Sequence, residues 1–495
     1  MRDRRFAPFV DQHGGRIYPM DTDLGITSRV LFIAYYFPPE GNAAVYRPLR
    51  FLKQLDLKGW RTTVICCEPY QYERYDPELL SQVPPGTRIV RVSGPDPWRA
   101  FQTWRGVRIE HKLAASSPDE ARKVVAVHHA PWRSRLREMV RNAEAWVYRP
   151  DIAMSWIRPV VKHVVDVCRQ DRPGIMWATI GPLSAGVAAY RASIAADIPY
   201  VLDFRDPWGL EYYAEEVRRP LWAKRLDRKM MRRIFARAQA VVFLFESIAE
   251  CYLRAFPESL DRKKIHIIPN GFEGGVQPFV HTPGAHCKVL YAGMLSSYRY
   301  DTLLEGLVRL KRRDPTRAKQ LKVHFVGEGL QQLADRVAAL GILDMIEIAP
   351  PVSHAEALRL QQEAHALLVL GRTPGRKGHE LVAGAKLFGY LQAGRPIIGV
   401  VPRDETRRIL EQVGCSTIAD GDSPDEVVAV FETVIDGWSN RVLESLVPDR
   451  SACEAYSSNR QISAFVRALI GASPEKVLSA QPGIPPLSVQ SEFVP

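Results

Sequence analysis

Short apolar runs recur along this chain at intervals that leave room for one helix between neighbours. This rhythm constrains the fold more than any other feature. Each run has the length and the branched or aromatic side chains of a strand that is buried on both faces of a sheet. In the first half the runs occupy residues 29–35, 62–66, 88–92, 175–180, 199–204, 240–245 and 264–268. Strands that alternate with helices predict a doubly wound α/β sheet.

The rhythm is interrupted after Pro269-Asn270-Gly271 by a segment rich in glycine and proline. Apolar runs then resume at residues 288–293, 323–327, 346–348, 366–370 and 396–400. The pattern therefore predicts two similar α/β halves joined by a short linker, rather than one large sheet. Two such halves leave a central cleft that faces the carboxyl ends of both sets of strands, where open parallel sheets bind ligands.

The same pattern sets the expected boundaries. A chain of 495 residues is long enough for two or three domains. Both ends lack apolar periodicity, and the last stretch is rich in proline. The prediction is a disordered tail at 1–28, an N-terminal domain at 29–275, a linker at 276–286, a C-terminal domain at 287–452 and a second disordered tail at 472–495.

Composition excludes several classes of protein. No apolar stretch approaches the roughly 20 residues that cross a bilayer, and the arginines near the N-terminus are not followed by the apolar run of a secretory signal. The seven cysteines are scattered, with neither a disulfide framework nor the spacing of zinc ligands. We therefore expect a cytoplasmic protein without a metal site.

The formal charge of +12 is concentrated in a few segments, notably residues 132–162 and 218–237. In the second of these, Leu226, Met230 and Ile234 recur every four residues among lysines and arginines. Such a helix can lie on the anionic inner face of the cell membrane, or it can pack its apolar stripe on the core and leave its cations in water. The sequence leaves both readings open. A nucleic-acid partner is not expected, because no nucleic-acid-binding module accompanies the charge.

Two turns in the second half are candidates for contact with phosphate groups. Gly293 ends the first strand of that half and is followed by Arg299, so a phosphate could approach the backbone there and meet a positive charge. Gly327 occupies the same place after the next strand. Ordinary structural turns explain both glycines equally simply.

The most informative stretch runs from Gly378 to Gly399, where a polar loop opens a short helix that ends at Gly394 and Pro396 leads into an apolar strand. Residues 384–398 resemble the signature of family 4 glycosyltransferases, read as P-S-K-L-F-E-Y-L-A-A-G-R-P-I-L, and in particular the branch that builds bacterial surface polysaccharides. Further segments resemble the same family: residues 37–41, 203–208 (D-F-R-D-P-W), 268–271 (I-P-N-G) and 455–469.

The resemblance spans residues 29–470 and implies a GT-B fold, with two Rossmann-like doubly wound domains facing a central cleft. It implies that residues 453–471 form a helix that crosses back to the first domain. It further implies an acceptor-side first domain and a second domain that binds a nucleotide-diphosphate sugar. The expected activity is a retaining, hexosyltransferase-like sugar transfer to a lipid-linked or saccharide acceptor in polysaccharide or glycolipid biosynthesis, without a metal or other cofactor.

The resemblance also assigns site residues. Lys386 is expected to bind the donor phosphates together with Arg299, Gly293 and Gly327. Arg205 and Asp206 are expected at the catalytic centre beneath the donor sugar, and an Arg205-Asp206 pair with a purely structural role is the alternative.

Two departures from the family pattern bear on activity. The ribose-binding glutamate is Gly389 here, which removes the carboxylate that would hold both ribose hydroxyls. The family's earlier glutamate, expected eight residues upstream, falls on Leu381, and Glu380 could replace it through a one-residue shift. The first of two expected cations in the donor turn is Met294, and cations on a neighbouring loop, Arg372, Arg376 and Lys377, are a second source of charge. Two rival functions stay open: a sugar-nucleotide epimerase of the same architecture, or a catalytically silent scaffold or binding protein.

Overall fold

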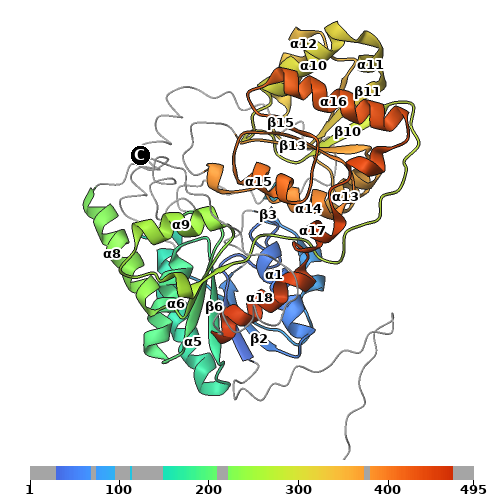
Figure 1. Cartoon of the computed structure of the whole chain (residues 1–495). Coiled ribbons are helices and arrows are strands. Elements are labelled where there is room, and N and C mark those ends of the chain that lie inside the picture. Colours follow the sequence, from blue (N-terminus) through green and yellow to red (C-terminus); the bar gives the residue numbers. More distant parts are fainter. Residues whose placement is uncertain are drawn as a thin grey trace, which may run out of the picture.

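The computed structural model describes residues 29–68, 74–94, 112–113, 149–208, 221–372 and 379–471. The expected tails at 1–28 and 472–495, most of the basic segment 132–162, and Arg376 and Lys377 lie outside these residues. Figure 1 shows two α/β halves, the first in blue to green and the second in yellow to red.

The first half is built on a parallel sheet with the strand order β4-β2-β1-β6-β7-β8-β9. The chain runs outward from β1 in one direction and from β6 in the other, which makes the β1/β6 boundary a switch point of the doubly wound kind. The strands are β1 (Arg29–Ile33), β2 (Arg61–Cys67), β4 (Arg88–Val92), β6 (Ile175–Ile180), β7 (Tyr200–Phe204), β8 (Ala240–Phe243) and β9 (Ile265–Ile267), with β3 (Arg74–Tyr75) and β5 (Lys112–Leu113) paired separately.

Alternate side chains of β1 face opposite layers of helices. Val30 and Phe32 join a buried cluster with α1 and the last helix, α18, whereas Leu31 and Ile33 join one with α5 and α6. Burial on both faces explains why these strands are apolar throughout. The helices of this half are α1 (Tyr46–Asp56), η2 (Pro77–Gln82), η3 (Ile152–Trp156), α5 (Ile157–Gln170), α6 (Ser184–Ala195), α8 (Leu221–Arg237), α9 (Glu246–Ala255) and η4 (Arg262–Lys264).

The second half repeats this plan with a parallel sheet in the order β12-β11-β10-β13-β14-β15. Its strands are β10 (Cys287–Ala292), β11 (Leu321–Val326), β12 (Ile346–Ala349), β13 (Ala366–Leu370), β14 (Ile397–Val401) and β15 (Ile418–Asp420). Its helices are α10 (Asp301–Arg313), α11 (Pro315–Gln320), α12 (Gln331–Leu340), α13 (His354–Glu363), η5 (His379–Leu381), α14 (Lys386–Gln392), α15 (Glu405–Gln412), α16 (Pro424–Ser439), η6 (Leu443–Leu446) and α17 (Arg450–Glu454). The predicted fold class of two parallel-sheet α/β halves is confirmed.

The last helix, α18 (Ser458–Ile470), returns to the first half, as expected. It packs beside α1, and Figure 1 shows it, in red, against the blue elements. Phe465 stacks on Phe51 with ring centroids 4.0 Å apart and meets Trp177 edge-on at 5.5 Å. The end of the chain is thereby part of the first hydrophobic core.

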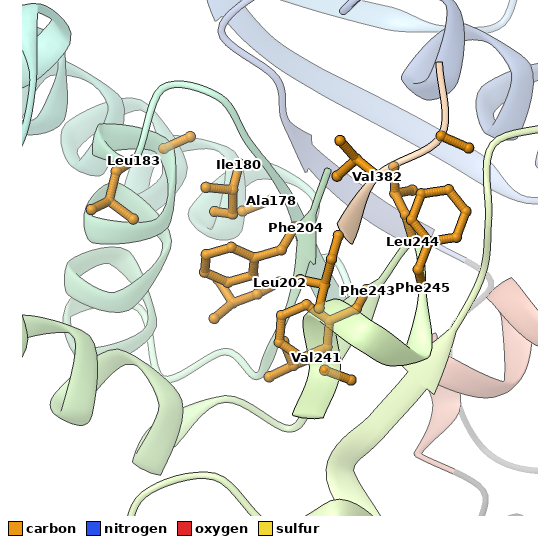
Figure 2. Close-up of a cluster of buried hydrophobic side chains, with 14 of the residues drawn as sticks. Ala178, Ile180, Leu183, Leu202, Phe204, Val241, Phe243, Leu244, Phe245 and Val382 are labelled. Carbon is orange, nitrogen blue, oxygen red and sulfur yellow. The ribbon is translucent and has the colours of Figure 1, made fainter. Parts of the chain in front are cut away.

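The two halves also touch beside their strand ends. Val382 and Ala383, which precede α14, belong to the same buried apolar cluster as Leu244 and Phe245 at the end of β8. Figure 2 shows Val382 next to these two side chains. The Ser247 hydroxyl, in the first turn of α9, lies 3.2 Å from both the Leu381 carbonyl oxygen and a Glu405 carboxylate oxygen. The segment leading into α14 is therefore anchored on the first half.

Candidate functional site

The expected donor residues lie where the strands of the second sheet end. Gly293 follows β10 and Gly327 follows β11, both with positive φ, +127° and +154°. A Cβ on Gly327 would lie 2.2 Å from the Gly293 carbonyl oxygen, so the two turns touch through their backbones. Close packing of the turns accounts for Gly327 without a ligand.

The Lys386 amine lies over the first of these turns. A Cβ on Gly293 would lie 3.3 Å from Lys386 Nζ. The amine is 3.7 Å from the ring centroid of Tyr291 and 4.3 Å from that of Tyr298, distances at which an aromatic face attracts a cation. Lys386 thus projects from the start of α14 to the carboxyl end of β10.

This amine is buried and has no hydrogen-bond partner among the residues that the structure describes. Burial, and secondarily the charge of Arg372, lower the pKa of Lys386 to about 7. Aromatic faces replace only part of the hydration that an ammonium loses on burial, so the amine remains short of negative charge. A bound anion would supply that charge.

Backbone contacts hold the aromatic rings around Lys386 in place. Tyr291 Oη donates a hydrogen bond of 2.8 Å to the Met294 carbonyl oxygen. From the same helix as Lys386, Tyr390 Oη accepts a hydrogen bond of 2.8 Å from the Ala292 amide. The Lys386 side chain therefore lies in a rigid aromatic surround, the kind of support that a binding group needs. Sequence patterns did not indicate these tyrosines, because their contribution depends on where their rings point.

The second expected cation, Arg299, already has an ion-pair partner. Arg299 forms an ion pair with Asp422 in the turn before α16. Its side chain is therefore not an uncompensated charge comparable with Lys386. That Arg299 shares the donor diphosphate stays a prediction.

Glu380 lies in η5, beside the contact between the halves, and its side chain is exposed. The backbone of its neighbour Leu381 accepts the Ser247 hydrogen bond. At the position of the family glutamate, a Cβ on Gly389 would lie 3.9 Å from Gln361 Oε1, a buried oxygen with no partner among the described residues. Glu380 is thus exposed beside the contact between the halves, whereas Gly389 lies next to a buried amide oxygen.

On the first half, Arg205 follows β7, and two backbone carbonyl oxygens hold its guanidinium group. Its Nη1 donates to the Ala44 carbonyl oxygen at 3.0 Å and its Nη2 to that of Gly181 at 3.3 Å, while its buried Nε has no partner in the described chain. Burial lowers the pKa of Arg205. The charge of Asp206 opposes this lowering of the Arg205 pKa, so the two side chains interact electrostatically, and both the catalytic role and the structural pair stay predictions.

The ion pair that the structure does form here was not predicted. Arg47 on α1 binds both carboxylate oxygens of Asp203, at 2.9 Å from Nε and 2.7 Å from Nη2, with side chains 3% and 0% exposed. Arg47 also donates to the carbonyl oxygens of Ile268 and Pro269. Arg47 therefore joins α1 both to β7, through Asp203, and to the I-P-N-G segment.

Within the described ranges, no group of three or more His, Cys, Asp or Glu side chains could hold a metal ion. No helix in that part of the chain is both long and apolar enough to cross a membrane.

Comparisons with known proteins place this geometry among glycosyltransferases. Residues 43–271 match the model of the glycosyl transferase 4-like domain. HepE of Anabaena, solved with UDP, shares 12% identity over 90% of this chain and 100% of its own, with a TM-score of 0.54. Sucrose-phosphate synthase of Thermosynechococcus elongatus shares 11% over 92% and 100%, with a TM-score of 0.55.

A TarM mutant of S. aureus, solved with fondaparinux, α-GlcNAc-glycerol and UDP, shares 8% identity over 89% of this chain and 99% of its own, with a TM-score of 0.52. No curated protein sequence matches the chain. At these identities the solved structures show the fold alone.

Proposed function

We propose that this chain is a glycosyltransferase, because residues 43–271 match the model of the glycosyl transferase 4-like domain and the whole has the two-domain GT-B fold. From this premise we propose that the protein transfers a sugar from a nucleotide-diphosphate sugar to a saccharide or lipid-linked acceptor. The observation that carries the proposal is the buried Lys386 amine at the carboxyl end of β10, which has no hydrogen-bond partner in the part of the chain that the structure describes. HepE, which is similar in fold, has been solved with UDP and with UDP-glucose, which supports a donor of this kind.

In the proposed reaction, the acceptor hydroxyl oxygen forms a bond to the anomeric carbon while the bond from that carbon to the donor phosphate breaks. The hydroxyl proton passes to the departing diphosphate, and the family resemblance implies that attack occurs on the face from which it leaves. Lys386 stabilises the negative charge that develops on the diphosphate, which is the role that a metal ion plays elsewhere. From the first half, Arg205 and Asp206 are the residues proposed for the catalytic centre.

A panel of nucleotide sugars tests the proposal. Thermal unfolding of the protein is measured with each compound, and a ligand at 100 times its dissociation constant adds about 2.7 kcal/mol to the free energy of unfolding. We expect at least one donor to stabilise the protein and to be consumed when acceptor is added. Stabilisation by none would favour a silent scaffold, and interconversion of sugars without acceptor would favour an epimerase.

Donor affinity is expected to decrease as the pH rises through neutrality. The pKa of Lys386 is about 7 in the free protein, and a bound diphosphate favours the protonated amine. The amine is charged below this pH and neutral above it, so we expect affinity to be highest near pH 6 and about tenfold lower near pH 8. The ligand is a nucleotide sugar, whose diphosphate has no terminal phosphate proton to lose in this range. Affinity that is constant across the range would contradict the role of Lys386.

We further propose that α8 brings the enzyme to the inner face of an anionic membrane. Ile234 and Met231 of this helix are buried, but Leu221, Trp222 and Leu226 at its start are 71%, 51% and 48% exposed. The expected apolar stripe is thus split between the core and the surface. Exposed lysines and arginines surround the outer part, and each contributes on the order of 1 kcal/mol to binding an anionic surface.

In the other basic segment, Trp156 is buried and donates to the Val92 carbonyl oxygen, so it is not a surface residue.

Reversing two exposed charges of α8, Arg225→Glu with Lys229→Glu, is expected to weaken binding to vesicles of phosphatidylserine and phosphatidylcholine about tenfold or more. Sedimentation with the vesicles measures this. The matched control reverses the exposed Arg312 and Lys319 of the second half and should leave binding unchanged. Equal losses in both variants would indicate a general charge effect and contradict a docking role for α8.

A further inference from the structure

Arg372 lies beside Lys386, at the carboxyl end of the neighbouring strand. It follows β13 by two residues, and its backbone forms an antiparallel bridge with Tyr298, one of the two tyrosines that contact Lys386. The preceding Gly371 is held on both sides, donating to the Val400 carbonyl oxygen at 2.8 Å and accepting from the Arg299 amide at 3.0 Å. The position of Arg372 is therefore set by three neighbouring segments of the same sheet edge.

Arg372 has no ion-pair partner within the ranges that the structure describes. Its Nε is buried without a hydrogen-bond partner, and within the described residues no carboxylate forms an ion pair with it. After burial, its charge is the second cause of the lowered pKa of Lys386, and it opposes the rise that burial causes in the pKa of Tyr298. Arg372 also acts electrostatically on Asp404, whose carboxylate accepts the Arg407 amide at 3.0 Å as the cap of α15.

Two cations without a counter-ion at one strand edge repel each other, and an anion that binds both relieves the repulsion. An ammonium and a planar guanidinium together suit a diphosphate, because the lysine acts as a point charge and the arginine can bind two oxygens at once. On the basis of the proposed function, we infer that Arg372 is the second cation of the donor site and holds the diphosphate jointly with Lys386. It takes the part that the sequence pattern assigns to Arg299.

Arg299 is the matched control, because it is an arginine on the same edge whose charge is already paired with Asp422. The variants Arg372→Gln, Arg372→Lys and Arg299→Gln are titrated by calorimetry with UDP and with inorganic pyrophosphate, which lacks base and sugar. We expect Arg372→Gln to bind both probes about tenfold more weakly, the effect of removing one charge-assisted hydrogen bond. Arg372→Lys should recover part of the loss, and Arg299→Gln should bind within about twofold of the unmodified protein.

A second readout separates a direct role of Arg372 from a merely structural one. Removing its charge should raise the pKa of Lys386, so the pH at which affinity for a nucleotide sugar declines should move upward in Arg372→Gln. Circular dichroism and thermal unfolding establish that each variant is folded.

Unchanged affinity in Arg372→Gln, or an equal loss in Arg299→Gln, would overturn the inference. If pyrophosphate binds in an Arg372-dependent manner but no nucleotide does, the anion site stands and the proposed transferase function fails. If the unmodified protein binds neither probe, both fail.

Discussion

Lys386→Met is expected to weaken donor binding roughly 10- to 100-fold and, at the same time, to make the free protein more stable. The lost affinity corresponds to a hydrogen bond to a charged group, about 1.5 to 3 kcal/mol. The gain in stability arises because the buried amine has no hydrogen-bond partner among the residues described and its pKa is lowered to about 7. Methionine fills the same aromatic surround without a charge to desolvate, and such replacements often stabilise by about 1 to 3 kcal/mol.

The sign of the stability effect depends on pH. Because the pKa of Lys386 is lower in the folded protein than in the unfolded chain, the unfolded chain binds more protons between these two pKa values. The cost of burying the charge is therefore present in full below about pH 7 and disappears as the pH rises. We expect the advantage of Lys386→Met to be largest near pH 6 and to shrink toward pH 9.

Urea unfolding across this pH range and calorimetry with the best nucleotide sugar measure the two effects. The matched control is Lys319→Met, which removes an exposed lysine of α11 and should change neither quantity. Loss of stability in Lys386→Met with unchanged donor affinity would show that the lysine has only a packing role.

Arg47→Leu is expected to lower the free energy of unfolding by about 3 to 5 kcal/mol, because it leaves the Asp203 carboxylate buried and unpaired. Both side chains of the pair are buried, and the arginine also donates hydrogen bonds to the carbonyl oxygens of Ile268 and Pro269. These contacts hold β7, α1 and the segment before the linker in one arrangement.

Urea unfolding of Arg47→Leu, Asp203→Leu and the double variant tests this. The double variant should lose clearly less than the sum of the single losses, because it buries no lone charge. The control is the exposed pair of Arg309 and Asp425, 42% and 82% exposed, whose disruption should cost less than about 1 kcal/mol. Strictly additive losses at Arg47 and Asp203 would contradict the pairing.

Much of the fold was predictable because fully buried parallel strands need continuous apolar runs. The run at 29–35 corresponds to β1, and the run at 346–348 to β12, each within two residues. The edge strand β15 was missed, since Ile418–Asp420 is too short to form such a run. The crossover helix was expected only through the family resemblance.

The site was predictable only in part. Lys386 could be assigned from its place at the start of a motif helix, but the fate of an arginine depends on partners far along the chain. Arg299 is paired with a residue 123 positions away and Arg47 with one 156 positions away. Tertiary packing decides that Arg299, and not Arg372, is paired with a carboxylate within the described residues. No local sequence pattern indicates this choice.

The most direct test of the account is the number of protons taken up when a donor binds at pH 8. Calorimetric enthalpies measured in buffers of different ionisation enthalpy give this number. Lys386 is mostly neutral in the free protein at pH 8, because its pKa is about 7. It must become protonated when it binds the diphosphate, so we expect the uptake of close to one proton for each donor bound. Donor binding without proton uptake, or no binding of any nucleotide sugar, would contradict it.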